Sequence, residues 1–161
     1  MIPAPRSLLL DTGIVVLLCR GGDAGKQLDA RYGLTWRRDV PLVSVISVGE
    51  LRAFARNASW GGAKEMRLKE LLGNLTIVDV NRDPVLTAYA DVSAHLKQSG
   101  RPIGQNDIWI AATARATGAT LLTTDKDFDV LHPALIQREY VAPDLLRQPP
   151  PAGERSTDGG T

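Results

Sequence analysis

Short apolar runs alternate along this chain with segments in which apolar residues recur at helical spacing. The apolar runs that predict strands lie at residues 7–10, 41–46, 75–80 and 119–123, with a short fifth candidate at 135–137. The segments that predict helices lie at residues 12–20, 47–57, 64–72, 83–98 and 106–117. Strands that are apolar throughout and alternate with helices are typical of a parallel sheet covered on both faces. We therefore predict an α/β fold: a three-layer α/β/α sandwich with a central parallel sheet of four to five strands.

The alternating pattern stops before the chain does. A length of 161 residues suits one domain, since domains typically run roughly 100–200 residues. From Pro143 onward the composition changes, and the segments 149–151 and 156–161 are too rich in Pro, Gly and polar residues to bury much apolar surface. We predict one domain over residues 1–142 and a disordered tail over residues 143–161.

The composition indicates a cytoplasmic protein that does not enter membranes. No apolar run approaches the roughly 18 residues that span a bilayer, and the stretch from Leu8 to Leu10 is too short for the apolar part of a signal peptide. Cys19 is the only cysteine, which excludes an internal disulfide and zinc sites that need two cysteines. A single thiol in an apolar stretch suits a core position in the reducing cytosol.

Four acidic residues stand at corresponding places beside the predicted elements. Asp11 directly follows the first strand, and Glu50 lies in the first turn of the helix after the second. Asp107 stands near the start of its helix, and Asp125 follows the fourth strand. Ligands of open parallel sheets bind beyond the carboxyl ends of the strands. We therefore expect these side chains to gather at one edge, where Asp127 is close enough to join them.

Four or five carboxylates in one pocket raise one another's pKa by mutual repulsion unless a cation lies between them. Oxygen ligands without a neighbouring Cys or His favour hard cations, so the sequence predicts a Mg²⁺ site at which Mn²⁺ can substitute. Such sites suit the hydrolysis of phosphate esters, in which one ion activates a water and a second stabilises the leaving oxygen.

Each acid also has a structural interpretation. Ser47 and Glu50 fit a capping box, in which the carboxylate would bond only the serine backbone. Asp107 could serve only the helix dipole, and Asp125 could be a turn residue. Asp11 is different, because a charged residue that ends a buried strand needs a partner. The metal-site hypothesis therefore depends on the whole set.

Four segments of the chain resemble the PIN domain family and, within it, the VapC-type toxins of bacterial toxin–antitoxin pairs. These segments are Leu9-Leu10-Asp11-Thr12 and residues 44–51, 103–112 and 121–128. They occur in the family's order and spacing, over roughly residues 7 to 138. The most specific of them are Asn-Asp-x-x-Ile-Ala-Ala, which starts at Asn106, and Thr-x-Asp-x-Asp-Phe, which starts at Thr123.

The resemblance implies a Mg²⁺- or Mn²⁺-dependent endoribonuclease that acts as the toxin of a type II toxin–antitoxin module. It also implies a homodimer, an RNA substrate and a cognate antitoxin protein as inhibitor. The implied catalytic and metal-binding acids are Asp11, Glu50, Asp107 and Asp125. The implied accessory residues are Asp127, Thr12, Thr124 and Asn106, of which the last would orient Asp107. Inactive members of the family usually lack acids, whereas this chain has all four.

Basic residues supply candidate contacts for RNA phosphates. Arg37 and Arg38 lie beside Trp36, and Arg52 and Arg56 share one face of their predicted helix. Solvated surface charge is the alternative for each of them. The net charge is only +1, but five of the 18 acidic residues belong to the predicted pocket, which leaves 13 against 19 basic residues. That balance suits a polyanionic partner.

Two other functions compete with the ribonuclease. A catalytically silent PIN-like interaction module would bind metal without cleaving RNA. An aspartate-dependent phosphatase would need a second acid two residues after Asp11, where this chain has Gly13. The sequence leaves the RNA target and the identity of the antitoxin open.

Overall fold

Five short parallel strands form the centre of the molecule, whose computed structural model describes residues 6–147. The strands are β1 (Leu8–Leu10), β2 (Leu42–Ser44), β3 (Thr76–Val78), β4 (Thr120–Thr123) and β5 (Gln137–Tyr140). They lie in the order β3-β2-β1-β4-β5, and every neighbouring pair is parallel. In the middle, Leu9 of β1 pairs with Leu42 on one side and with Leu121 on the other. The predicted parallel sheet is confirmed.

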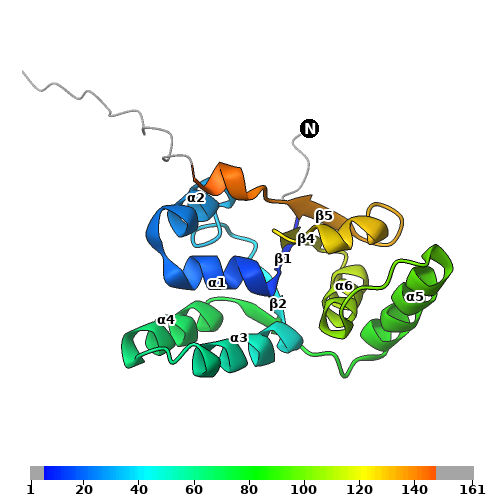
Figure 1. The fold of residues 1–161 in the computed structure, drawn as a ribbon, viewed down its shortest axis with the longest axis horizontal. Coiled ribbons are helices and arrows are strands. Elements are labelled where there is room, and N and C mark those ends of the chain that lie inside the picture. Colours follow the sequence, from blue (N-terminus) through cyan, green and yellow to red (C-terminus); the bar gives the residue numbers. More distant parts are fainter. Residues whose placement is uncertain (1–5, 148–161) are drawn as a thin grey trace, which may run out of the picture.

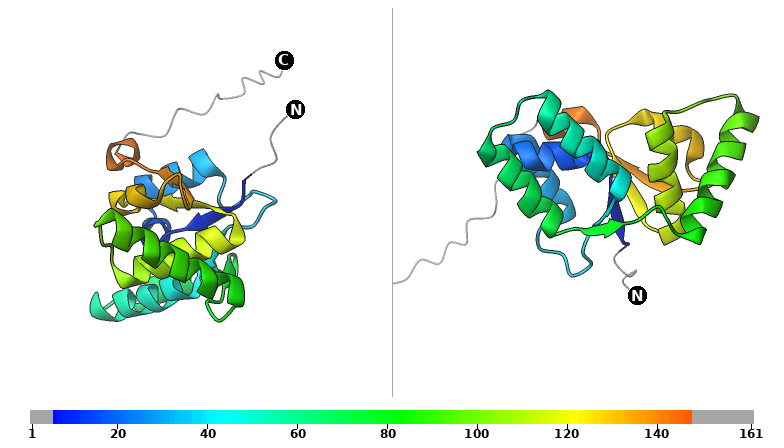
Figure 2. Two further views of the ribbon diagram at one scale, coloured as in Figure 1. Left: turned by 90° about the vertical axis from the view of Figure 1, so that its right-hand side faces the viewer. Right: turned by 90° about the horizontal axis from the view of Figure 1, so that it is seen from below.

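Helices cover both faces of this sheet. They are α1 (Thr12–Arg20), α2 (Gly22–Tyr32), α3 (Val45–Asn57), α4 (Gly62–Gly73), α5 (Asp83–Ser99) and α6 (Gln105–Thr117), with two 3₁₀ helices, η1 (Lys126–Leu131) and η2 (Pro143–Leu146). Figure 1 shows α1–α4 on one side of the sheet and α5 and α6 on the other, and Figure 2 shows these layers from two further directions. The predicted three-layer sandwich is confirmed. None of the helices in the described residues is long and apolar enough to cross a membrane.

The central strand explains why the fold has three layers. Successive residues of a strand point to opposite faces of its sheet. Leu8 and Leu10 therefore join the core under α1–α4, whereas Leu9 joins the core under α5 and α6. Leu9 and Leu10 are fully buried, and each such side chain contributes about 1.5–3 kcal/mol when it leaves water. A strand that is apolar on both faces is stable only when helices cover both.

Two local elements differ from the sequence-based expectation. Helix α2 was not predicted, because its residues are mostly polar and only Gly25 and Leu28 of it are buried. Helix α3 begins at Val45, and its N-cap is Ser44, whose hydroxyl accepts a hydrogen bond from the Ile46 N–H at 3.2 Å. The helix therefore starts too early for Ser47 to cap it, and the capping-box alternative for Glu50 is excluded.

The predicted tail falls only partly within the described residues. Residues 143–146 form η2, and Leu146 packs against the core under α1–α4. Residues 148–161 lie outside the described part of the chain, so the disorder expected there stays a prediction.

Candidate metal centre

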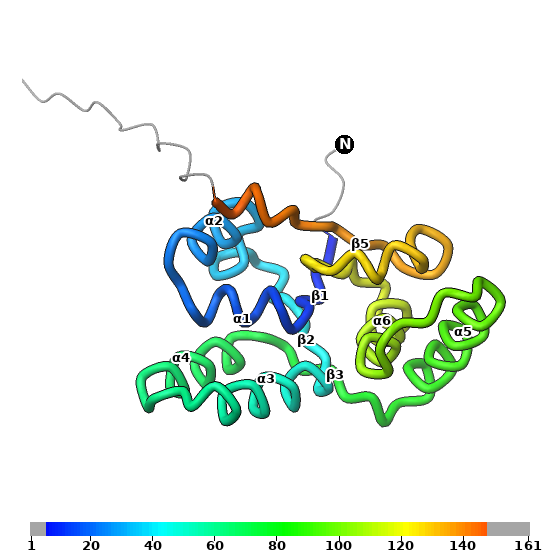
Figure 3. The backbone as a smooth tube through the Cα atoms, viewed as in Figure 1, coloured from blue at the N-terminus to red at the C-terminus, as the bar shows by residue number. Residues whose placement is uncertain are grey.

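Five carboxylates meet beyond the carboxyl ends of the central strands. Asp11 follows β1 and caps α1, whereas Asp125 follows β4 and caps η1, whose first turn contains Asp127. Glu50 lies on α3, and Asp107 lies in the first turn of α6. The start of α1 lies beside the first two turns of α3, and the start of α6 contacts the same part of α3 (Figure 3). The structure thus brings together all five acids that the sequence singled out.

Three of these acids lie close enough to share one cation. Asp107, Asp125 and Asp127 each offer a carboxylate oxygen within 4.8 Å of the others. Oxygen atoms arranged in this way are suitable ligands for a hard divalent cation. Asp127 therefore stands beside two of the predicted ligands, closer to the centre than its accessory assignment suggested.

Burial and mutual repulsion raise the pKa of two carboxyl groups in the cluster. The pKa of Asp107 rises from 3.8 to about 7, first because burial removes water from the group and then because Asp11, Asp125, Glu50 and Asp127 surround it with negative charge. Burial also raises the pKa of Asp11, although hydrogen bonds to its carboxylate oppose this effect. A divalent cation would relieve the repulsion, so the chemistry of the donor set fits Mg²⁺ or Mn²⁺.

Hydrogen bonds hold Asp11 in place at the end of β1. The Thr123 hydroxyl donates to Oδ2 of Asp11 at 2.6 Å, and the Thr12 N–H donates to Oδ1 at 2.8 Å. The same Thr123 hydroxyl accepts a hydrogen bond from the Asp125 N–H at 2.9 Å. The sequence analysis did not assign Thr123 a role. The available signal was a hydroxyl residue at the last position of a buried strand, two residues before an acid.

A second set of hydrogen bonds holds Glu50. The Thr12 hydroxyl donates to its Oε1 at 2.7 Å, and the Asn106 amide donates to its Oε2 at 3.2 Å. The hydroxyl of Ser47, one turn before Glu50, lies 2.9 Å from that of Thr12 and is hydrogen-bonded to it. Asn106 thus contacts Glu50 rather than Asp107, which corrects the role that the resemblance implied. The contribution of Ser47 was not foreseen, because it was considered only as a cap.

Two further residues lie near the carboxylates: Gly104 leaves room for one of them, whereas Thr124 points away. A Cβ atom at Gly104 would lie 3.1 Å from Oδ2 of Asp107, so the N-cap of α6 leaves room for that carboxyl group. Thr124, an implied accessory residue, turns instead towards α1 and lines a cavity with Phe54 and Leu146.

The four arginines proposed to contact RNA lie away from the carboxylates. The Arg37 guanidinium donates to the Arg6 carbonyl at 2.9 Å, just before β1, which places it at the amino edge of the sheet. Arg38 is the next residue and is exposed. Arg52 and Arg56 line a groove between α3 and α4. These positions do not support direct contact with a phosphate held at the acidic edge.

The fold and the site together define a parallel α/β sandwich with carboxylates gathered at its carboxyl edge, beside the ends of β1 and β4. A model of the PIN domain matches residues 8–132, and the chain belongs to this family.

Similar proteins extend over nearly the whole domain. The chain is 29% identical over 133 residues to "Ribonuclease VapC5" of Mycobacterium tuberculosis. The aligned region covers 81% of this chain and 92% of that protein. It is 31% identical over 115 residues to "Ribonuclease VapC1" of Haemophilus influenzae, which covers 71% of this chain and 84% of that protein.

Solved structures show the same likeness. The VapBC-1 structure from nontypeable Haemophilus influenzae matches with a TM-score of 0.69 and 25% identity, over 83% of this chain and 96% of that one. The structure of VapBC-5 from Mycobacterium tuberculosis, a member of the VapBC family of toxin-antitoxin systems, matches with a TM-score of 0.63 and 27% identity, over 85% of this chain and all of that one.

Proposed function

We propose that this protein is a Mg²⁺- or Mn²⁺-dependent endoribonuclease that acts as the toxin of a type II toxin–antitoxin module. The observation that carries the proposal is the convergence of five carboxylates at one sheet edge, with the pKa of Asp107 raised to about 7. Such a cluster is costly without a cation, and perturbed carboxyl groups of this kind gather at functional sites. The relatives named as ribonucleases support RNA as the substrate.

The ligands in this proposal are Asp11, Glu50, Asp107 and Asp125, with Asp127 completing the triad of oxygen atoms around Asp107. A bound divalent cation would activate water and neutralise charge at the scissile phosphate. The protein's own contribution is to hold the carboxylates in place before the ion arrives, because supporting hydrogen bonds orient metal ligands.

Each supporting residue has a distinct task in this scheme. Thr123 fixes one oxygen of Asp11 and the backbone of Asp125, so the ends of β1 and β4 keep a constant separation. Thr12 and Asn106 fix the two oxygens of Glu50 from opposite sides. Asp107 would release its proton on cation binding, because the positive charge would offset the burial and the surrounding negative charge that raise its pKa.

The same proposal includes the partners and location that the resemblance implied. A cognate antitoxin would inhibit the enzyme in the cytoplasm, and the toxin would form a homodimer. Structures of relatives described as VapBC, among them a member of a toxin-antitoxin family, support the antitoxin.

Cleavage of total cellular RNA tests the proposal directly. The purified full-length chain, freed of bound protein and refolded, is incubated with Mg²⁺ or Mn²⁺, with EDTA and the Asp11→Asn variant as controls. An Asp23→Asn variant, which changes an exposed acid on α2, is the matched control. We expect discrete fragments from the wild type and from Asp23→Asn, and none with EDTA or Asp11→Asn.

The opposite result has a defined meaning. Folded protein that binds Mn²⁺ but leaves every RNA intact would overturn the ribonuclease and favour the catalytically silent interaction module.

A further inference from the structure

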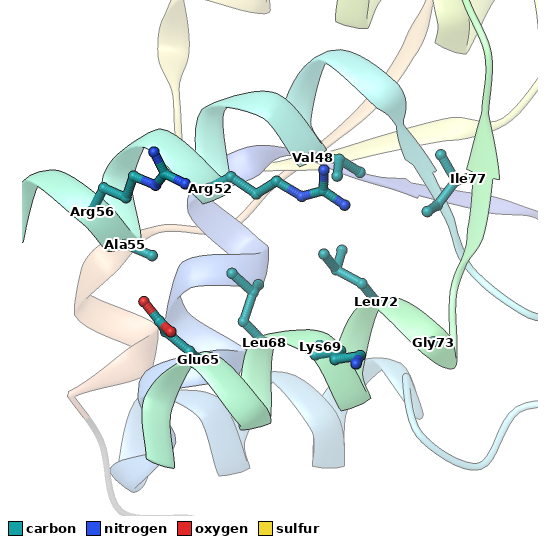
Figure 4. A pocket seen from close by; sticks show the side chains of 10 residues that line it. All are labelled: Val48, Arg52, Ala55, Arg56, Glu65, Leu68, Lys69, Leu72, Gly73 and Ile77. Carbon is teal, nitrogen blue, oxygen red and sulfur yellow. The ribbon is translucent and has the colours of Figure 1, made fainter. Parts of the chain in front are cut away.

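A lysine, rather than any of the four arginines considered above, is the basic residue that stands among the acids of the candidate metal centre. Arg52 and Arg56 line the groove between α3 and α4, as Figure 4 shows, and do not approach the carboxylates. Lys126 lies between Asp125 and Asp127 in the chain. An RNA phosphate that approaches this acidic edge needs positive charge to offset the repulsion. The surroundings of Lys126 decide whether it can supply that charge.

The Lys126 ammonium is exposed and is paired with no acid. Lys126 is the first residue of η1, directly after the N-cap Asp125. Within residues 6–147 its side chain forms no ion pair and no hydrogen bond, although acids precede and follow it. An ammonium paired with either aspartate would compete with a cation for that carboxylate. The unpaired ammonium leaves the carboxylates to the cation and keeps its three donors for another anion.

An aromatic ring holds the Lys126 side chain to one side of the acids. Nζ of Lys126 lies over the ring of Tyr140 on β5, 5.6 Å from the ring centre. The face of an aromatic ring attracts an ammonium at this range, because its π electrons carry partial negative charge. The contact limits the freedom of a flexible side chain before any ligand arrives, which lowers the entropic cost of binding.

The Tyr140 ring is itself fixed by the edge strand. In the pairing of β4 with β5, Tyr140 is the register partner of Thr123, whose hydroxyl supports the carboxylate cluster. The Arg138 guanidinium also lies over the ring, 5.9 Å from its centre, and its Nη2 pairs with the Asp129 carboxylate on η1 at 2.7 Å. Figure 1 shows η1 beside β5. Because Arg138 is committed to Asp129, Lys126 is the cation of this group that is left for a ligand.

We propose that Lys126 binds an RNA phosphate beside the carboxylate cluster, and that Tyr140 is the positioning residue that holds its ammonium there. The inference rests on the proposed function in taking RNA as the ligand. An ammonium binds phosphate oxygens as a point charge and does not read the base. A nucleobase is disfavoured on the Tyr140 ring, because the cations of Lys126 and Arg138 already lie over it.

The salt dependence of RNA binding tests the phosphate contact. The full-length Asp11→Asn protein in Mg²⁺ serves as the reference, so that the RNA stays intact. The probes are fluorescein-labelled oligouridylate and oligoadenylate of ~20 nucleotides, longer than the roughly 4–16 that one single-strand site occupies. Fluorescence anisotropy gives the Kd of each probe at several NaCl concentrations.

Removing the ammonium should weaken both probes alike. Lys126→Ala should raise each Kd by the same factor, roughly tenfold. It should also lower the slope of log Kd against log NaCl concentration by about 0.7, the share of one phosphate on a single strand. Lys126→Arg should retain most of the binding. Lys26→Ala, which removes an exposed lysine on α2, is the matched control and should change neither quantity.

Variants of the ring separate a positioned ammonium from general surface charge. Tyr140→Leu leaves the lysine in place but removes its support, and should weaken both probes by roughly two- to fivefold. Tyr140→Phe keeps the ring and should bind like the reference, which also controls for folding. When combined with Lys126→Ala, Tyr140→Leu should cause no further loss, because the two residues act on one contact.

The kinetics of the active protein give an independent measurement. With Asp11 intact, Lys126→Ala should raise KM for RNA cleavage by about tenfold and change kcat little, because the phosphate is bound equally before and during the reaction. A fall in kcat at constant KM would overturn the assignment, because it would place Lys126 in the chemical step.

Three binding results would overturn the proposal. The first is an unchanged Kd and salt slope in Lys126→Ala while the wild type still cleaves RNA, which would leave the proposed function intact. The second is a loss that differs between the two probes, which would make the ring a platform for bases. The third is a loss from Tyr140→Leu that persists in full beside Lys126→Ala. The expected losses in a protein that cleaves no RNA would support the contact and overturn only the ribonuclease.

Discussion

The hydroxyl of Thr123 donates a 2.6 Å hydrogen bond to Asp11, although the two residues are 112 positions apart. It reaches across the pairing of β1 with β4, in which Leu10 stands beside Leu122, the residue before Thr123. Thr123 is fully buried and Asp11 is 7% exposed, so little water can replace this bond. The bond lowers the pKa of Asp11 and opposes the effect of burial. It thereby favours the ionised carboxylate that a cation requires.

Removing this hydroxyl should damage both stability and metal binding. Thr123→Val keeps the shape but leaves the Asp11 carboxylate and the Asp125 N–H without their partner, which should cost about 1–3 kcal/mol of unfolding free energy. Loss of a residue that orients metal ligands should reduce cleavage by about 10–100-fold. Urea unfolding and RNA cleavage are the measurements. Thr123→Ser retains the hydroxyl and should stay close to wild type; equal losses in both variants would contradict this explanation.

The stability of the metal-free protein should fall as the pH rises. The pKa of Asp107 is about 7 in the folded protein against 3.8 in the unfolded reference, so between these values the folded state binds more protons. The stabilising contribution of the protonated Asp107 carboxyl group is therefore complete below about pH 4 and is lost by about pH 7. Asp107→Asn should flatten this slope and stabilise the EDTA-treated protein by about 1–2 kcal/mol at pH 7.5, since solvent screens the half-buried group. Urea unfolding across this pH range measures both effects, and an unchanged slope in the variant would refute them.

The affinity of the protein for Mn²⁺ should depend on whether Asp107 is protonated. Below pH 7 a cation has to displace the proton from Asp107, so Mn²⁺ affinity should rise by up to about tenfold per pH unit and level off above pH 7. Calorimetric titration with Mn²⁺ at several pH values, in buffers of different ionisation enthalpy, would also count the protons released. Release of no protons and a flat affinity from about pH 5 to pH 8 would contradict the assignment.

Asn106 should act on catalysis through Glu50. Asn106→Ala removes the amide that holds Oε2, so Glu50 gains freedom and cleavage should drop by about 10–100-fold with little change in stability. Gln105→Ala is the matched control, because the neighbouring amide donates to the Tyr89 hydroxyl instead. A larger effect on the turnover rate than on KM is expected, since the change moves a ligand rather than the RNA-binding surface. Equal activity in both variants would show that Asn106 does not contribute to cleavage through Glu50.

Two glycines beside the acids should respond in opposite ways to a methyl group. At Gly104 the added Cβ would lie 3.1 Å from Oδ2 of Asp107, so Gly104→Ala should shift that carboxylate and weaken Mn²⁺ binding by roughly tenfold. At Gly49, next to Glu50 on α3, no heavy atom of the described residues lies within 4 Å of the added Cβ apart from the chain neighbours and the nearby backbone of α3. Gly49→Ala should therefore preserve cleavage and stabilise the helix by about 0.5–1 kcal/mol. Comparable loss of metal affinity in both would show that crowding at Asp107 is not the cause.

Local patterns account for the parts of the fold that could be predicted. The run from Leu8 to Leu10 is apolar at every position, which indicates a strand covered on both faces, and helical spacing identified α1, α5 and α6. Helix α2 was not predicted, because few of its residues are buried. One of them, Gly25, packs against the backbone of α1, and a contact of this kind leaves no hydrophobic periodicity in the sequence. The start of α3 was misplaced because Ser44 and Ser47 are equally good caps when only the sequence is considered.

The sequence by itself determined that acids follow the strands, and that parallel strands would carry them to one edge. Only the tertiary structure decided which donor bonds to which carboxylate oxygen. Thr123 donates to Asp11, and Asn106 donates to Glu50 rather than to Asp107. Strand and helix patterns arise within a few residues of chain, so they can be recognised locally. Hydrogen bonds and open grooves depend on positions set to within a few tenths of an ångström by the packing of segments far apart in sequence, and those positions exist only once the layers have assembled.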